Sequence, residues 1–324
     1  MKYLFVPHTQ AQALKQELVE KGILEQGPVL RELDRVGFPV KEVLEGYDLE
    51  ERAFAPPNTF RSIREALVAR IGDRANEIKR AFDIIGDIAI LEATPGFEDV
   101  EREIGEALLE VHRNVKSVYI KQGAHEGAYR IQSYRWIAGD KRTITQHREN
   151  GYLLELDIAT AYYSPRVAGE RMRIARLVVP EENVLVLGSG VGPYAICIEK
   201  HSAAAHIVGV EYNEDAHRWA ERNVERNRCA RIECLRADAR SYLSTSPRFD
   251  RIIMPLPAQS NELLPYAWKA LAPGGSLHLY LFAKEDDLSA PPVKDLCGYR
   301  IEHIETVGAA APGYYRICVD LRKD

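Results

Sequence analysis

The chain has 324 residues, of which 46% are hydrophobic and 28% are charged, and its formal net charge is −5. A chain of this length and composition folds into two or three globular domains, which excludes a disordered, collagen-like or coiled-coil protein. The negative charge also argues against a protein that coats nucleic acid through an overall positive surface.

Membrane and export signals are not seen in the sequence. No run of 18 apolar residues occurs, and the first ten residues, MKYLFVPHTQ, have neither the apolar stretch nor the cleavage site of a signal peptide. We therefore expect a cytoplasmic protein with no membrane partner, and we expect a monomer.

Residues 1–57 are predicted to form a small N-terminal α/β module. Residues 2–6 have the pattern of a strand, and residues 9–21 have helical spacing that ends at Gly22. The breaker sequence Ala-Pro-Pro-Asn at residues 55–58 is typical of a linker between domains.

Residues 58–156 are predicted to form an α+β domain. Helical patterns cover residues 59–80 and 97–111. Strand-like runs lie at residues 82–91, 117–121, 129–136, 142–147 and 152–157. We interpret Gly86 as a bulge within the first of these runs.

Positive charge is concentrated in this domain. Residues 113–148 contain eight Lys and Arg but only two acids, a net charge of +6. Such a stretch is either an anion-binding site or a solvated face of a sheet. The basic residues are Arg113, Lys116, Lys121, Arg130, Arg135, Lys141, Arg142 and Arg148.

Residues 157–324 alternate between short apolar strands and helices, which predicts a parallel, doubly wound sheet. The predicted strands are residues 184–187, 207–211, 232–236, 251–254 and 276–281, and the predicted helices are residues 193–201, 215–227 and 262–271. All five cysteines lie in this part without a zinc-ligand spacing, so we expect reduced thiols and no metal site.

A glycine-rich loop follows the first strand of this domain. Gly188, Gly190 and Gly192 form a G-x-G-x-G pattern, which lets the backbone pass close to a ligand at a helix N-terminus. The next strand ends at Glu211, whose carboxylate can accept the hydroxyls of a ribose. Asp238 ends the third strand, where it can contact an adenine amino group or cap a helix. Together they indicate an adenosine-containing ligand.

This pattern resembles class I S-adenosylmethionine methyltransferases, which implies a Rossmann-like fold and S-adenosyl-L-methionine as cofactor. Such enzymes often carry a proline-containing loop after the fourth strand, and here that loop is Met-Pro-Leu-Pro at residues 254–257, ending at Pro257.

More specific segments resemble the archaeal and eukaryotic tRNA (guanine-37-N1)-methyltransferases of the Trm5 type. The segments HRENG at residues 147–151 and YSPRVAGER at residues 163–171 are similar to the family's H-x-E-x-G and F-S-P-R-x-x-x-E-R signature. Glu211-Tyr212-Asn213 resembles its ribose clamp. The resemblance implies tRNA as partner, with the N-terminal module recognising tRNA shape and the α+β domain contributing to RNA binding and to the active site.

The chain departs from this family at several positions. Pro255 stands where the family has an Asn whose amide could contact the guanine or the methyl donor, Gly313 replaces an Arg, and Val186 stands in a strand end that often carries an acid. These changes affect the expected substrate geometry more than the fold.

The resemblance also implies roles for individual residues. Methylation of guanine N1 needs removal of its proton and stabilisation of charge at O6. Glu170 stands at the family's base position, although an acid at a helix N-terminus is the alternative interpretation. Arg130 resembles the arginine that contacts O6, and Arg166 one that orients Glu170 or the RNA backbone.

Two other functions remain open. One is a wyosine-pathway enzyme that acts on the same nucleotide, either by aminocarboxypropyl transfer or by methylation of a tricyclic base. The other is a noncatalytic RNA-binding relative with a decayed donor site. The Ser-Pro-Arg segment at residues 164–166 favours guanine methylation.

Overall fold

The computed structural model describes residues 1–25, 29–44, 46–52, 60–79, 81–126, 131–288, 293 and 296–324. These residues form two compact units, Met1–Ser62 and Ile63–Asp324. The predicted linker sequence at residues 55–58 and the predicted site residue Arg130 lie outside the described residues.

The first unit is an antiparallel sheet with one helix packed on it. Its strand order is β2-β3-β1-β4, and α1 buries Leu14 and Leu18 against Leu4 and Val6 of β1. The helix therefore presents one apolar stripe to the sheet, as its spacing predicts. The elements are β1 (Lys2–Pro7), α1 (Ala11–Glu20), β2 (Leu30–Arg31), β3 (Arg35–Val40) and β4 (Asp48–Glu51).

The second unit begins with a four-stranded sheet of order β5-β6-β7-β8. The pair β6 and β7 is parallel, and the other two pairs are antiparallel. The amphipathic helix α3 packs on β7 and β8 and also contacts α2. The elements are α2 (Ile63–Ile71), β5 (Phe82–Ile85), β6 (Ile88–Leu91), α3 (Glu101–Val111), β7 (Ser117–Glu126) and β8 (Ile131–Gly139).

The interpretation of Gly86 as a bulge within one strand is wrong. Residues 82–91 form two strands of a hairpin, and Gly86 with Asp87 makes the turn between them. Gly86 has φ +61°, which an L residue rarely adopts. A Cβ on Gly86 would also collide with Thr145 and with the carbonyl of Gln146 on β9 (Ile144–Glu149).

A two-stranded hairpin of β9 and β10 (Tyr152–Asp157) leads into the largest sheet. Two asparagines bind the edge of β10 that does not face β9. Asn223 lies in the helix α6 (Glu214–Arg226), and Asn227 is the C-cap of that helix. Asn223 Oδ1 accepts the Glu155 N–H at 2.7 Å, and Asn227 Oδ1 accepts the Leu153 N–H at 3.0 Å. These amides take the place of a neighbouring strand.

The largest sheet has seven strands in the order β13-β12-β11-β14-β15-β17-β16. The first five are parallel, whereas β17 runs antiparallel between β15 and β16. Its strands are β11 (Asn183–Leu187), β12 (His206–Glu211), β13 (Ile232–Arg236), β14 (Phe249–Met254), β15 (Leu271–Lys284), β16 (Tyr299–Ala311) and β17 (Tyr314–Lys323).

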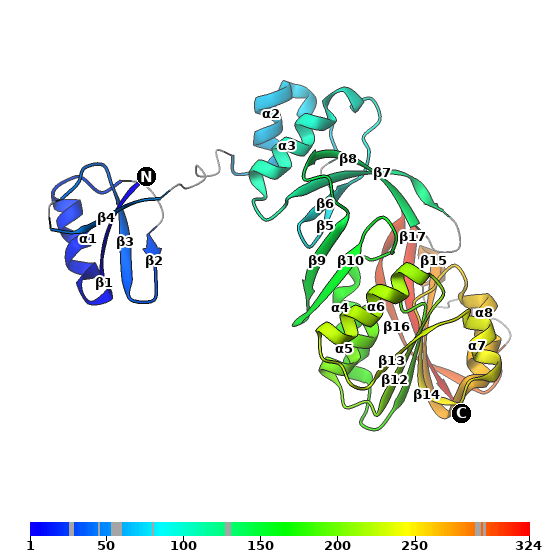
Figure 1. The fold of residues 1–324 in the computed structure, drawn as a ribbon. Helices are drawn as coiled ribbons and strands as arrows, with labels where there is room; N and C mark the ends of the chain where they lie inside the picture. Colours follow the sequence, from blue (N-terminus) through cyan, green and yellow to red (C-terminus); the bar gives the residue numbers. More distant parts are fainter. Residues whose placement is uncertain are drawn as a thin grey trace. The chain divides into compact units, whose positions relative to one another are not determined.

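Helices cover both faces of this sheet (Figure 1). Along β11, Val184 and Val186 face α4, α5 and α6, whereas Leu185 and Leu187 face α7 and α8. Burial on both faces explains the continuous apolar runs of the sequence and confirms the predicted α/β Rossmann-like fold. The remaining helices are α4 (Ala168–Leu177), α5 (Pro193–His201), α7 (Ala239–Thr245) and α8 (Ser260–Ala270).

Candidate active site

The predicted glycine loop connects β11 to α5, and its three glycines have positive φ values of 65°, 55° and 90°. A Cβ on Gly188 would collide with Leu256, and one on Gly192 would press on Ile196 at 3.3 Å. At Gly190 the closest atom to a Cβ is the Tyr162 carbonyl at 3.8 Å. Gly188 and Gly192 therefore serve close packing, and Gly190 lies beside open space.

Glu211 ends β12 directly opposite this loop. Its Oε2 accepts the Gly190 N–H at 2.7 Å, and its Oε1 accepts the Asn213 N–H at 2.7 Å. A carboxylate offers about four acceptor positions, so two remain for hydroxyl groups of a ligand. The residue thus fixes the loop and can still bind a ribose.

Asn213 and Asp238 both cap helices. The side-chain oxygen Oδ1 of Asn213 accepts the Asp215 N–H at 3.0 Å, and its side-chain Nδ2 donates to the Thr160 carbonyl at 2.7 Å. Asp238 accepts the Ser241 N–H at 2.9 Å. Asn213 therefore ties α6 to the loop that precedes the second signature segment, and no described residue binds the other carboxylate oxygen of Asp238.

A first cavity of about 430 Å³ opens beside the loop. Its wall contains five of the predicted residues, namely Gly188, Gly190, Glu211, Asn213 and Asp238. The predicted residues Gly192 and Pro257 do not belong to this wall. The wall also contains residues that no sequence motif marked, namely Tyr162, Arg240, Leu256, Gln259 and Glu262.

A second cavity of about 500 Å³ shares Tyr162 with the first. Its wall is aromatic and charged, with rings from Tyr134, Tyr162 and Phe282. Burial raises the pKa of Tyr134 to about 12, so its hydroxyl stays protonated. The cavity lies between the four-stranded sheet, the segment of residues 162–167 and the ends of β15, β16 and β17. The aromatic residues lie in different elements, which is why no local motif marked them.

Arg166 lines the second cavity and is bound to the four-stranded sheet. Its Nε donates to Asp83 Oδ1 of β5 at 2.6 Å. The predicted partner Glu170 does not contact it within the described residues. Arg166 therefore joins the signature segment to β5.

Glu170 belongs to the wall of neither cavity. It is only 7% exposed, and Arg173 donates to both of its oxygens, at 2.7 and 2.8 Å. Tyr280 of β15 donates its hydroxyl to Glu170 Oε1 at 2.6 Å. Three donors thus hold the carboxylate in the first turn of α4.

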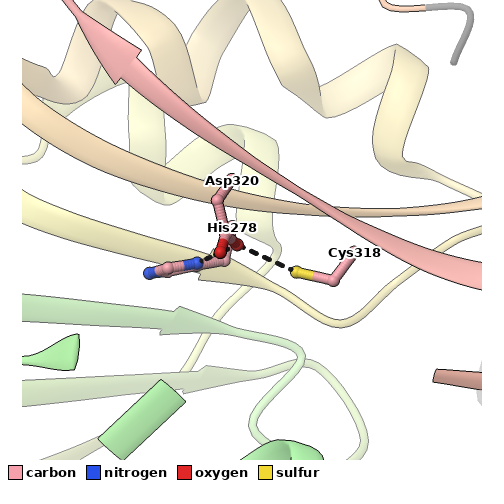
Figure 2. Close-up of side chains that lie close together, drawn as sticks. All are labelled: His278, Cys318 and Asp320. Carbon is pink, nitrogen blue, oxygen red and sulfur yellow. Dashed lines mark hydrogen bonds and ion pairs between the residues drawn. The ribbon is translucent and has the colours of Figure 1, made fainter. Parts of the chain in front are cut away.

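The donors of Glu170 are themselves held by a buried network. Asp320 of β17 accepts Arg173 Nη1 at 2.6 Å and also contacts His278 Nδ1 at 2.6 Å, as Figure 2 shows for the His278 pair. His278 Nε2 lies 2.7 Å from Arg251 Nη1, and Arg251 pairs with Glu182. A chain of ion pairs and hydrogen bonds therefore runs from Glu182 to Glu170 through the sheet.

The protonation of His278 follows from its partners. A guanidinium can only donate, so His278 Nε2 accepts from Arg251 and Nδ1 donates to Asp320. Burial lowers the pKa of His278, which agrees with a neutral ring. Burial alone would raise the pKa of Asp320, but His278 and Arg173 bring it below its usual value.

The same cluster has the donor set of a zinc site, because Cys318 Sγ also lies 3.4 Å from Asp320 (Figure 2). Both nitrogens of His278 are committed to hydrogen bonds, and the guanidinium groups of Arg173 and Arg251 repel a cation. Burial also raises the pKa of the Cys318 thiol, which opposes the thiolate form that binds metal. The arrangement is that of an ion-pair network.

The signature residues Glu149 and Arg171 form a second buried ion pair. Arg171 Nε donates to Glu149 Oε1 at 2.7 Å, and the arginine is 2% exposed. Tyr163 donates to the same carboxylate at 2.5 Å. The pair joins β9 to α4 and explains why both signature segments contain a charged residue.

Three of the eight basic residues in the stretch of residues 113–148 pair with acids from other segments. Lys121 pairs with Glu92, Arg135 with Glu101 and Arg142 with Asp87. The sequence count of +6 includes none of these acids. The folded surface is therefore less positive than the sequence suggests.

Comparison with known proteins supplies a context for this site. A model of the TRM5/TYW2 methyltransferase domain matches residues 145–303, and a model of the TYW2 N-terminal domain matches residues 63–143. The tRNA (guanine(37)-N(1))-methyltransferase Trm5b of Pyrococcus abyssi is 33% identical over 98% of this chain and 97% of its own. None of the helices in the described part of the chain combines the length and apolarity needed to span a bilayer.

Two further relatives bear on substrate. A solved complex of aTrm5 with tRNALeu has a TM-score of 0.75 and 26% identity, covering 100% of both chains. The tRNA 4-demethylwyosine(37)-methyltransferase Taw21 of Saccharolobus solfataricus is 27% identical over 80% of this chain and 99% of its own. By their names, these relatives act on the same tRNA position, 37, but one acts on guanine and the other on 4-demethylwyosine.

Proposed function

We propose that this chain, which belongs to the TRM5/TYW2 methyltransferase family, transfers a methyl group from S-adenosylmethionine to N1 of guanosine 37 in tRNA. The observation that carries the proposal is the pair of cavities that meet at Tyr162. Methyl transfer needs neighbouring donor and acceptor sites, and two cavities that share a wall residue support such an arrangement.

The first cavity fits the methyl donor. Glu211 has acceptor positions for the ribose hydroxyls, and Asp238 has an oxygen for the adenine amino group. Leu256 and Leu263 offer an apolar surface for the adenine ring. The bound donor would supply a methyl group on a positively charged sulfur, and the protein residues would orient it toward Tyr162.

The second cavity fits a nucleotide base. The rings of Tyr134, Tyr162 and Phe282 provide stacking surfaces for a base that has left its helix or loop. The same cavity could hold guanine or a tricyclic derivative. The 33% identity to Trm5b over nearly the whole chain favours guanine.

Removal of the N1 proton needs a carboxylate, and we propose Glu170 with Arg130 as the stabiliser of O6. Glu170 is fully engaged by Arg173 and Tyr280, so its action requires that RNA binding release it from them. Asp83, which lies beside Arg166, is one of two carboxylates that line the second cavity; the other, Glu92, pairs with Lys121. Asp83 is therefore the competing candidate.

Two experiments test the proposal. Unmodified tRNA transcripts with G37 and with A37 are incubated with the protein and S-adenosylmethionine, and their nucleosides are analysed by mass spectrometry. We expect 1-methylguanosine from the first transcript alone. A product formed only from tRNA that carries 4-demethylwyosine would support the wyosine-pathway function instead. Donor binding without product would support the noncatalytic relative.

The base is tested by comparing Glu170→Gln with Asp83→Asn. Loss of a general base lowers a single-turnover rate by about 10²–10⁴, with little change in tRNA or donor affinity. We expect this loss for Glu170→Gln and less than tenfold loss for Asp83→Asn. The reverse result would assign proton removal to Asp83.

A further inference from the structure

Arg316 of β17 lies at the wall of the second cavity, and no acid among the described residues pairs with it. Its Nε atom is buried, and it has no hydrogen-bond partner. No ion pair or side-chain hydrogen bond joins its guanidinium to any other residue that the structure describes. Buried donors are normally paired, so an unpaired one at a cavity wall needs a ligand to satisfy it.

The other charges of this cavity are balanced. Lys121 pairs with Glu92 at 2.5 Å, and Arg166 pairs with Asp83 at 2.6 Å. The described residues of this wall include two acids and three bases, so their net charge is +1, and the unmatched charge belongs to Arg316. The site therefore complements one negative charge.

The neighbours of Arg316 keep it open to a ligand. Arg316 on β17 is paired with Phe282 on the neighbouring strand β15 and with Gly308 on the other neighbour, β16. Gly308 has no side chain that could cover the guanidinium. Side chains of directly opposite residues share a face of the sheet, so the Phe282 ring and the guanidinium flank the same part of the cavity. Phe282 is 38% exposed, which leaves its ring available for stacking.

We propose that Arg316 binds a phosphodiester group of the RNA strand that enters the second cavity; this rests on the proposed function. A guanine base is neutral before it reacts, whereas a phosphodiester is charged throughout. A guanidinium without a protein counterion complements the permanent charge, and it can donate two parallel hydrogen bonds to phosphate. The aromatic rings would then hold the base, and Arg316 would hold its backbone.

The proposal is tested by measuring affinity for a fluorescently labelled tRNA transcript between about 50 and 200 mM salt. The variants are Arg316→Gln, Arg316→Lys and the control Arg300→Gln. Arg300 lies on the neighbouring strand β16, and its exposed side chain is outside both cavities. Donor binding by calorimetry shows that each variant is folded.

We expect Arg316→Gln to weaken tRNA binding about tenfold. The slope of log affinity against log salt should fall in magnitude by about 0.7, the value for one contact to a single-strand phosphate. Arg316→Lys should keep the slope and lose part of the affinity, because an ammonium binds as a point charge. Arg300→Gln should match the wild type in both.

Two results would overturn the proposal. One is wild-type affinity and slope for Arg316→Gln. The other is unchanged affinity with a lower single-turnover rate, which would assign Arg316 to charge on the reacting base. If Arg316→Gln shows the expected loss of affinity and slope but the wild type transfers no methyl group, the proposed function fails while the phosphate contact stands.

Discussion

The carboxylate of Glu211 connects the glycine loop to the start of α6 through two backbone N–H groups. Replacing it with alanine leaves the N–H groups of Gly190 and Asn213 without their acceptor, and it removes the oxygens that face the first cavity. We expect Glu211→Ala to weaken S-adenosylmethionine binding by roughly 1–3 kcal/mol, as measured by calorimetry. Glu214→Ala, in the exposed first turn of α6, is the control and should bind normally. Equal affinity of the two variants would remove Glu211 from the donor site.

Individual residues differed in how far the sequence could place them. Glu211 was predictable because a strand end and a glycine loop fix its position along a parallel sheet. The contacts of Glu170 were not, since its donors come from Arg173 in its own helix and from Tyr280 on β15, 110 residues away. Local patterns carry no information about such distant partners.

The turn between β5 and β6 docks directly on β9. His147 Nδ1 accepts the Gly86 N–H at 3.0 Å, and Thr145 Oγ1 accepts the Asp87 N–H at 3.2 Å. Gly86 therefore has a positive φ and no room for a side chain. The four-stranded sheet is attached to the β9–β10 hairpin through this contact.

Gly86→Ala should destabilise the protein more than Gly96→Ala. Both glycines have positive φ, so both substitutions cost roughly 1–2 kcal/mol of backbone strain. Only at Gly86 does the new methyl group collide with β9, which adds about 1–3 kcal/mol, whereas nothing lies within 4 Å at Gly96. Urea unfolding of the two variants measures the difference. Equal midpoints would show that the turn does not depend on β9.

At the level of elements, the parallel strands were the most predictable. Predicted residues 184–187, 207–211 and 232–236 coincide with β11, β12 and β13 to within one residue, because strands buried on both faces appear as short apolar runs. The strands β16 and β17 were not predicted. β16 is an exposed edge with three register shifts, and its polar residues mask the alternation that identifies a strand.

Across the whole molecule, the buried His278 and the half-buried His147 make stability depend on pH. Burial lowers the pKa values of both His147 and His278 below 6.5. His147 Nδ1 accepts the Gly86 N–H, and His278 Nε2 accepts from Arg251, so protonation would break both contacts. The unfolded chain therefore binds more protons than the folded one just below pH 6.5.

The free energy of unfolding should be highest above about pH 7 and should fall as the pH drops from about 7 to 5. Each histidine contributes a slope of at most about 1.4 kcal/mol per pH unit. Urea unfolding at a series of pH values measures this slope. His147→Gln with His278→Gln should flatten it, whereas His303→Gln, at an exposed position of β16, should not. An unchanged slope in the double variant would assign the effect to other groups.

The placement of β17 between β15 and β16 has a consequence for biosynthesis. A ribosome that has delivered β15 and β16 has not yet made the strand that lies between them. Until β17 emerges, the apolar edge of β15 has no partner, and Arg173 lacks Asp320. The nascent domain therefore has an unpaired strand edge, which can pair with other chains, until late in translation. Chaperone binding at that stage would protect it from aggregation.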